Sequence, residues 1–224
     1  MRFKSIAIDG PAGAGKSTLA KQASQKIGFL YVDTGAIYRT VGLKVLTSGK
    51  DPSNPDQVAS LLSGLDIRVG YADGGQRMYL HGEDVSDLIR EPKVSDAASK
   101  ISAQKAVRDF LLDFQRLQAR EHNVIMDGRD IGTVVLPHAD LKVFLTADAE
   151  ARARRRLLEL EQRGQNADYG VVLHDIMDRD RRDQTREIAP LRRAKDAVLL
   201  DTTELGLKES LEALLAIIKE HIVL

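Results

Sequence analysis

Gly10-Pro11-Ala12-Gly13-Ala14-Gly15-Lys16-Ser17-Thr18 stands near the start of this 224-residue chain and has the spacing of a phosphate-binding loop. The residues on either side predict a buried strand at 5–9 and a helix at about 16–27. Glycines let successive backbone N–H groups point at one anion, and the N-terminus of the helix adds its positive dipole end. A glycine-rich turn without a ligand is the alternative, but this strand and helix are the context that the loop requires. We therefore expect residues 10–18 to bind a nucleoside triphosphate.

Two side chains of the loop have specific expected roles. The Lys16 ammonium can reach the β- and γ-phosphates, and the Ser17 hydroxyl can bind Mg²⁺. Asp127 ends a predicted strand at 123–127 and is expected to hold the same ion through its water shell. Asp33 ends another predicted strand, and ligands bind at the carboxyl ends of parallel strands. Either aspartate could instead be a helix N-cap, which is the commoner use.

Composition limits the kinds of partner. There are 33 basic and 33 acidic residues, so overall charge does not indicate a nucleic-acid partner. Cysteine is absent, which excludes a disulfide framework and thiolate metal sites. We find no leader-like start and no apolar run of about 18 residues, and we expect a cytoplasmic protein that does not associate with membranes. Tyr31 and Tyr38 are expected in the core.

Hydrophobic patterning predicts an α/β fold. Strands are expected at residues 5–9, 29–32, 123–127, 141–145 and 197–201. Helices are expected at about 16–27, 35–47, 93–102, 105–120, 149–163 and 207–222, with a further short helix that ends near residue 64. Five nearly continuous apolar strands joined by helices predict a parallel sheet that is covered on both faces. Residues 65–69 and 78–81 alternate around a turn at 72–75, which predicts an inserted antiparallel hairpin with a third strand at 83–85.

Eleven arginines lie between residues 152 and 195. Arg179, Arg182 and Arg186 are three and four residues apart, so they are expected on one helical face before a loop. Arginines on a mobile segment can stabilise the charge of a phosphoryl group in transfer and exclude water. For the arginines at residues 152–156 we expect no role at phosphate, only the commoner position on a solvated helix face.

Five blocks make the chain resemble the bacterial cytidylate kinases, in the nucleoside monophosphate kinase group of phosphate-loop proteins. They are residues 8–18, Asp-Thr-Gly-Ala-Ile-Tyr-Arg at 33–39, Gly-Glu-Asp-Val at 82–85, the Asp-Gly-Arg-Asp block at 127–135 and the arginine region at 179–191. The resemblance covers the whole chain in order, and the second and fourth blocks are its specific part. It implies a phosphate-loop kinase fold, with a five-stranded parallel sheet, helices on both faces, a small antiparallel insertion and a helical lid.

The resemblance also implies one domain over residues 1–224. Its monophosphate-binding region would span about 35–108, with the antiparallel insert at 65–86, and its lid about 150–195. One departure stands out, because Lys105 occupies a position where family members often have proline. That leaves the start of the following helix open.

For function, the resemblance implies a monomer that transfers the γ-phosphoryl group of ATP to CMP or dCMP with Mg²⁺. Lys16, Arg129, Arg179 and Arg186 would be catalytic. The family's cytosine contacts correspond to Ser99, Arg108 and Asp130, with Asp33 and Thr34 beside them; its phosphate contacts to Arg39, Arg129 and Arg186; and its ribose contacts to Arg179 and Asp183. A carboxylate such as Asp130 can accept a hydrogen bond from the cytosine N4 amine.

Two other classes stay open. A nucleotide-dependent switch would share the phosphate loop, although the Asn-Lys-x-Asp guanine-binding motif of GTPases is absent. A kinase for UMP, dTMP or a hydroxy acid would share every feature of the loop. Only the acceptor pocket separates that possibility from a cytidylate kinase.

Overall fold

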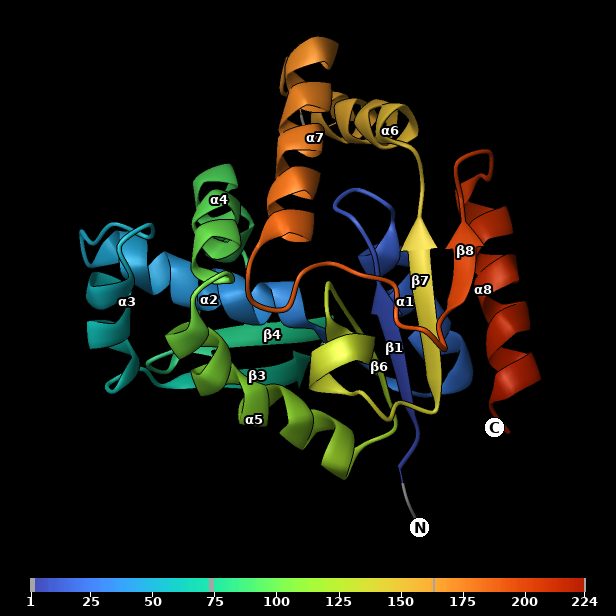
Figure 1. The fold of residues 1–224 in the computed structure, drawn as a ribbon, viewed down its shortest axis with the longest axis horizontal. Helices are drawn as coiled ribbons and strands as arrows, with labels where there is room; N and C mark the ends of the chain where they lie inside the picture. Colours follow the sequence, from blue (N-terminus) through green and yellow to red (C-terminus); the bar gives the residue numbers. More distant parts are fainter. Residues whose placement is uncertain (1–2, 73–74, 163, 224) are drawn as a thin grey trace.

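The central sheet has five parallel strands in the order β2-β6-β1-β7-β8 (Figure 1). The computed structural model describes residues 3–72, 75–162 and 164–223. The strands are β1 (Ser5–Asp9), β2 (Leu30–Asp33), β6 (Val124–Gly128), β7 (Leu141–Thr146) and β8 (Val198–Asp201). The predicted five-stranded parallel sheet is therefore confirmed, with no boundary shifted by more than one residue.

Side chains of β1 alternate between two apolar clusters, one on each face of the sheet. Ile6 and Ile8 pack with α1 (Lys16–Ile27) and α8 (Leu207–His221), whereas Ala7 belongs to the opposite cluster. This alternation follows from the two-residue period of a strand. Helices thus cover both faces of the sheet, as the apolar strands predict.

The second face carries most of the remaining elements. Its helices are α2 (Thr34–Thr47), α3 (Pro55–Leu62), α4 (Pro92–Ile101) and α5 (Lys105–Glu121), and a 3-10 turn spans Leu88–Arg90. The inserted antiparallel sheet is confirmed as β3 (Ile67–Ala72), β4 (Gly75–Leu80) and β5 (Glu83–Asp84). Part of the predicted turn at 72–75 lies outside the described residues. Helix α5 begins at Lys105 itself, so the absence of proline there does not displace the helix.

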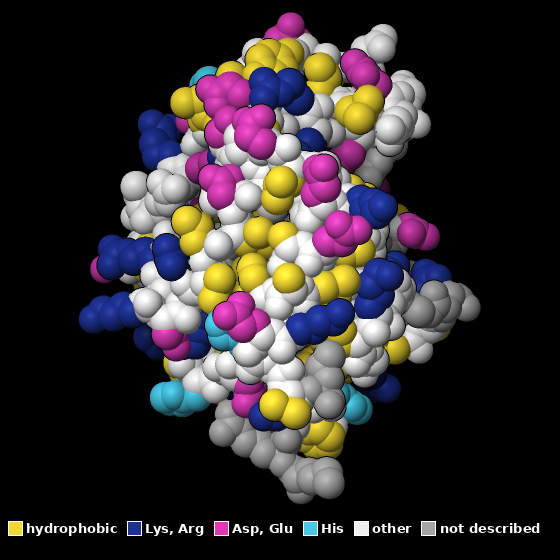
Figure 2. Space-filling model, turned by 90° about the vertical axis from the view of Figure 1, so that its right-hand side faces the viewer, with side chains coloured by type: hydrophobic (Ala, Val, Ile, Leu, Met, Phe, Trp, Pro, Cys, Tyr) yellow, Lys and Arg dark blue, Asp and Glu magenta, His cyan; other side chains and the backbone are white. Residues whose placement is uncertain are grey.

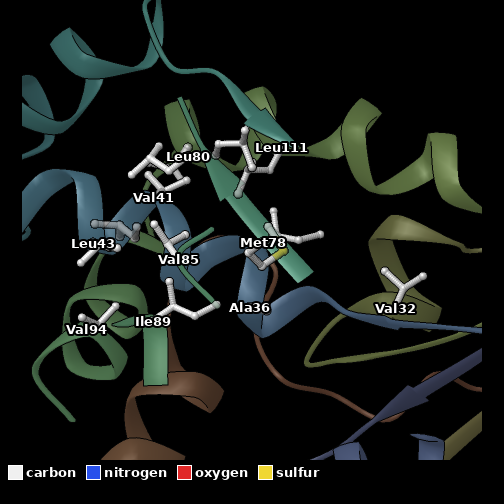
Figure 3. Close-up of a cluster of buried hydrophobic side chains, with 14 of the residues drawn as sticks. Val32, Ala36, Val41, Leu43, Met78, Leu80, Val85, Ile89, Val94 and Leu111 are labelled. Carbon is white, nitrogen blue, oxygen red and sulfur yellow. The ribbon is translucent and has the colours of Figure 1, made fainter. Parts of the chain in front are cut away.

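The insert packs on α2 through apolar side chains. Figure 3 shows Met78 and Leu80 of β4 beside Val41 and Leu43 of α2, and all four are buried. This shared cluster fixes the insert beside the helix that follows β2.

Two helices lie above the carboxyl ends of the strands, at the top of Figure 1. They are α6 (Ala149–Gln162) and α7 (Tyr169–Thr185), and they share a small buried cluster of Ala153, Val172 and Ile176. The predicted end of the first helix at 163 lies outside the described residues. The site therefore has helices over the edge where parallel strands end.

Charged side chains of both signs are mixed on the face around α8 (Figure 2), in keeping with a formal net charge of zero. In the described part of the chain, no helix is both long enough and apolar enough to cross a membrane.

Candidate active site

The predicted phosphate-binding loop connects β1 to α1 at the carboxyl end of the sheet. Gly10 has φ of 152°, and a Cβ atom there would come within 1.9 Å of the Leu145 carbonyl oxygen, so a larger residue cannot replace it. Gly13 has φ of 75°, a left-handed conformation that favours glycine. The N-cap of α1 is Gly15, which has no side chain to cap the amides of the first turn. Those N–H groups are directed at the loop, where an anion can accept their hydrogen bonds.

Lys16 lies inside this loop and is only 5% exposed. Its Nζ atom donates a hydrogen bond to the Pro11 carbonyl oxygen at 2.7 Å. Burial lowers the pKa of Lys16, and the nearby guanidinium groups of Arg129 and Arg179 lower it further. Several cations that repel one another in a buried place form a site for a polyanion.

Asp127 and Ser17 meet beside the loop. The Ser17 hydroxyl donates to Asp127 Oδ2 at 2.8 Å, and the Tyr31 hydroxyl donates to Oδ1 at 2.9 Å. Burial raises the pKa of Asp127, and the negative charge of Asp33 acts in the same direction. Tyr31 is partly buried, as expected of a core residue, but its hydroxyl also orients this carboxylate.

This pair of oxygen donors fits Mg²⁺, which binds proteins through one or two carboxylates and completes its shell with phosphate oxygens and water. Residues 3–72, 75–162 and 164–223 contain no cluster of three or more His, Cys, Asp or Glu side chains able to hold a metal alone. A metal at Ser17 and Asp127 would therefore complete its shell with water and with oxygens of a bound phosphate.

Asp9, which the sequence analysis did not single out, connects the loop to the turn after β6. Its carboxylate oxygens accept hydrogen bonds from the backbone N–H groups of Ile131 and Gly132, both at 2.7 Å. Burial raises its pKa to about 6, although those two hydrogen bonds oppose the shift. The signal available in the sequence was its place at the end of a buried strand, the same signal that indicates Asp33 and Asp127.

This buried carboxyl predicts a pH dependence of stability. Between about pH 4 and 6 the folded chain keeps a proton on Asp9 that the unfolded chain has released, so the free energy of unfolding should fall as pH rises through this window. Asp9→Asn removes the titration and should flatten that slope in urea unfolding followed by circular dichroism. Asp127 titrates in the same direction, so some slope should remain. An unchanged slope would contradict a protonated Asp9.

Arg108, Asp130 and Arg186 form a buried group at the start of α5. Arg108 Nη2 pairs with Asp130 Oδ2, and Arg186 Nη2 lies 3.3 Å from Asp130 Oδ1. Ser102 joins the group, since its carbonyl oxygen accepts from Arg108 at 3.2 Å and its hydroxyl lies 3.4 Å from Arg186. Arg108 and Asp130 thus lie together as predicted, and Arg186, predicted on a phosphate, is beside Asp130 in this structure. These ion pairs hold the Asp130 carboxylate in a fixed position, where it could accept a hydrogen bond from a polar ring.

A cavity of about 330 Å³ adjoins this group between α5 and the segment after α7. Tyr38, Leu112 and Ile188 line it together with Arg108 and Gln115. Apolar walls with a few polar groups are typical of small-molecule sites of this size.

Arg129 and Arg179 lie between the group of Arg108, Asp130 and Arg186 and the phosphate-binding loop. Arg129 Nε donates to Asp183 Oδ2 at 2.8 Å, which brings the predicted residues of β6 and α7 together. In the described residues, Arg179 Nε is buried without a hydrogen-bond partner. Burial lowers the pKa of Arg179 to about 10, and repulsion from Arg129 contributes. A buried guanidinium N–H group without a hydrogen-bond partner favours a bound anion, although Asp183 offsets part of the charge of Arg179.

The remaining predicted residues surround the end of β2. Asp33 caps α2 by accepting from Ala36 N at 2.8 Å, and it pairs with Arg39 at 2.8 Å. The Thr34 hydroxyl donates to the Asp127 carbonyl oxygen at 2.7 Å. Asp33 is therefore an N-cap, and a ligand-binding role remains compatible with this, because capping α2 keeps the side chain at the carboxyl end of β2.

Two further side chains complete this region. Gln76 of the insert accepts from Asp33 N at 2.8 Å and was not predicted. Ser99 is half-buried on α4, and its carbonyl oxygen accepts from the Ser102 hydroxyl at 2.8 Å. The insert thus contacts the site at Asp33, and Ser99 is linked to Arg108 and Arg186 only through Ser102.

The expectation of a solvated face for residues 152–156 is wrong for two arginines. Arg152 is only 4% exposed. Arg155 hydrogen-bonds the Thr202 hydroxyl and the Leu205 carbonyl oxygen, both at 3.2 Å. Arg154 alone is fully exposed in this run, so the prediction holds there. Similar charges along one helix do not reveal which side chain turns toward the core.

The expectation of one shared face for Arg179, Arg182 and Arg186 also needs correction. Arg179 is half-buried and its Nε atom is buried, whereas Arg182 is exposed and pairs with Asp96 of α4 at 3.2 Å. Arg186 follows the last helical turn as the C-cap of α7. Helix α7 ends at Thr185, so Arg186 does not continue the helical spacing of Arg179 and Arg182.

A phosphate-binding loop at the centre of a parallel sheet, with a serine–carboxylate pair and converging arginines, defines a phosphate-loop protein of the kinase class. A family model described as cytidylate kinase matches residues 6–220. The chain belongs to the cytidylate kinase family.

Individual relatives agree with that assignment. The cytidylate kinase of Caldicellulosiruptor bescii is 50% identical over 96% of this chain and 95% of its own length. The cytidylate kinase of Geobacter sulfurreducens is 47% identical over 96% of this chain and 93% of its own. Among solved structures, an uncharacterized protein from Eubacterium ventriosum superposes with a TM-score of 0.51 at 11% identity, covering 96% of this chain and 98% of that one. This last likeness concerns the fold alone.

Proposed function

We propose that this chain transfers the γ-phosphoryl group of ATP to CMP or dCMP, giving ADP and CDP or dCDP. Family membership supports the reaction. The observation that carries it here is the buried Arg108–Asp130 pair beside the phosphate-binding loop, since it offers a fixed carboxylate and a guanidinium to a polar base.

The donor would bind at residues 10–18. Backbone N–H groups of the loop and of the first turn of α1 would hold its phosphates, and Lys16 would turn from Pro11 toward the β- and γ-phosphates. Mg²⁺ would be held by Ser17 directly and by Asp127 through water, and when bound it supplies charge neutralisation for the phosphates.

The acceptor would bind between the insert, α5 and α7. Asp130 would accept from the N4 amine, and Arg108 would donate to the acceptors of the ring. Other contacts would come from Thr34, Asp33 and Ser99 near the base, from Arg39, Arg129 and Arg186 at the phosphate, and from Arg179 and Asp183 at the ribose. The ion pairs Asp33–Arg39, Arg129–Asp183 and Arg186–Asp130 support this grouping.

No general base is needed, because the attacking phosphate oxygen of CMP is already anionic. Lys16 and the arginines would stabilise the charge that spreads over the transferred group. The region at about 150–195, with α6 and α7, would act as the lid and exclude water, and the region at about 35–108 would bind the monophosphate. We further propose one domain, a monomer and a cytoplasmic location, without nucleic-acid or membrane partners.

A panel of acceptors tests the function. We expect rapid ADP release from ATP with CMP or dCMP and far slower release with UMP, AMP, GMP or dTMP, because a mismatched base does not match the acceptor of Asp130 and the donors of Arg108 and leaves buried polar groups unsatisfied. A coupled ADP assay measures this. Equal rates with UMP would favour a general monophosphate kinase, and ATP hydrolysis without any preferred acceptor would favour a nucleotide switch.

A further inference from the structure

Arg152 connects three parts of the molecule that are distant in the sequence. Its Nε atom donates to the carbonyl oxygens of Ala147 at 2.9 Å and Asp148 at 3.1 Å, at the junction of β7 and α6. Its Nη1 atom donates to the Ala12 carbonyl oxygen of the phosphate-binding loop at 3.0 Å. Its Nη2 atom donates to Asp180 Oδ2 of α7 at 2.6 Å. One planar guanidinium thus joins the base of the two helices to the loop below them.

The loop also packs on the aliphatic part of Arg152. A Cβ atom at Gly13 would lie 3.4 Å from Arg152 Cβ, which means that the crest of the loop rests on this side chain. The side chain of Arg152 is 5% exposed, so its charge is taken up by these partners rather than by solvent.

Asp180 lies in the part of α7 that carries the predicted catalytic groups. Arg179 precedes it, and Asp183 follows one turn later on the same face. Asp183 pairs with Arg129 of the core, so two successive turns of α7 are held by ion pairs. One pair lies beside the phosphate-binding loop and the other beside the end of β6.

We propose that Arg152 and Asp180 are a positioning pair that fixes α7 over the phosphate-binding loop, so that Arg179 stands over the phosphates and water stays out. This rests on the proposed phosphoryl transfer. Neither residue needs to touch the reacting atoms. Loss of the pair leaves α7 attached through Asp183 but no longer aligned with the loop. A displacement of about 1 Å can lower a rate by up to roughly 10²-fold.

Two conservative variants separate alignment from charge and size. Asp180→Asn keeps the shape of the side chain and removes its charge, and Arg152→Lys keeps a charge but cannot span the same acceptors. In each we expect kcat for CMP phosphorylation to fall about 10- to 100-fold, while KM for CMP changes little. ATP hydrolysis without CMP should rise relative to transfer, since water enters. Circular dichroism checks folding.

Additivity gives a second readout. If the two residues act as one unit, the double variant should be no slower than the slower single variant. Matched controls are Arg154→Lys, fully exposed on α6, and Asp178→Asn, partly exposed on α7 and paired only with exposed groups. Both controls should keep wild-type kcat and hydrolysis.

Three results would contradict the proposed positioning role of Arg152 and Asp180. They are an unchanged ratio of hydrolysis to transfer, additive effects of the two variants, or equal losses in the controls. Should Asp180→Asn fail to fold, Arg152→Lys with its hydrolysis ratio decides alone. Failure of the proposed function looks different, because the wild-type protein would then not phosphorylate CMP at all.

Discussion

Lys16→Met is expected to abolish measurable phosphoryl transfer while leaving the fold intact. Methionine has a similar length but no charge, so the γ-phosphoryl group loses a buried cation when its negative charge is most spread. Loss of one such contact typically lowers kcat by about 10²- to 10³-fold. The coupled ADP assay with saturating CMP measures this loss.

The same variant should not be less stable without ligands. Because burial and Arg129 lower the pKa of Lys16, the charged ammonium opposes folding, and the wild type should lose stability as pH falls below the ordinary lysine range. Methionine removes that cost, so Tm at neutral pH should equal or exceed that of the wild type. Lys26→Met, at an exposed position of the same helix, is the control and should keep full activity. Turnover above about a tenth of wild type would refute the assigned loop chemistry.

Asp130→Asn is expected to narrow the preference for CMP over UMP by roughly 10²-fold or more, because sites built to hydrogen-bond a polar group discriminate strongly through it. The amide can donate to the UMP carbonyl, whereas the carboxylate can only accept. KM for ATP should stay nearly constant, since Asp130 lies on the acceptor side. Full kcat/KM values for both nucleotides measure the effect.

Stability has to be controlled in that experiment. Asp130 pairs with Arg108 and Arg186 in the interior, and removal of a buried partner costs about 3–5 kcal/mol. Kinetics should therefore be measured well below the Tm of the variant. Asp113→Asn, exposed on the same helix α5 and outside the cavity lining, is the matched control and should leave both nucleotides unaffected. A loss of ATP affinity, or an unchanged preference, would remove Asp130 from base recognition.

The fold was predictable because its signals are local. Apolar runs such as residues 5–9 and 141–145 indicate buried strands wherever they occur, and glycine spacing at 10–15 needs no tertiary information. The alternation at 65–69 and 78–81 is equally local, which explains why the insert was found, although β3 and β4 themselves span Ile67–Ala72 and Gly75–Leu80.

Contacts between distant segments could not be predicted in this way. Asp9 binds amides 122 residues away, and Arg152 binds a carbonyl 140 residues away. Helical periodicity orients α6 through the apolar positions Ala149, Ala153, Leu157 and Leu160, but it does not show that Arg152, beside this face, is buried while Arg154 is exposed. The small buried residues Ala151 and Ala153 on either side were the weak signal that favoured a buried position.

Strands β6, β1 and β7 lie in the interior of the sheet, each hydrogen-bonded on both sides, while β2 and β8 form its edges. Native-state hydrogen exchange proceeds through local openings that begin at exposed and marginal elements. The amides of β6, β1 and β7 should therefore exchange slowest, and β1 and β6 lead directly into the phosphate-binding loop and the Asp127–Asp130 turn. If an edge strand or the antiparallel insert frays, the phosphate-binding loop and the start of the Asp127–Asp130 turn would stay attached to the strands that open last.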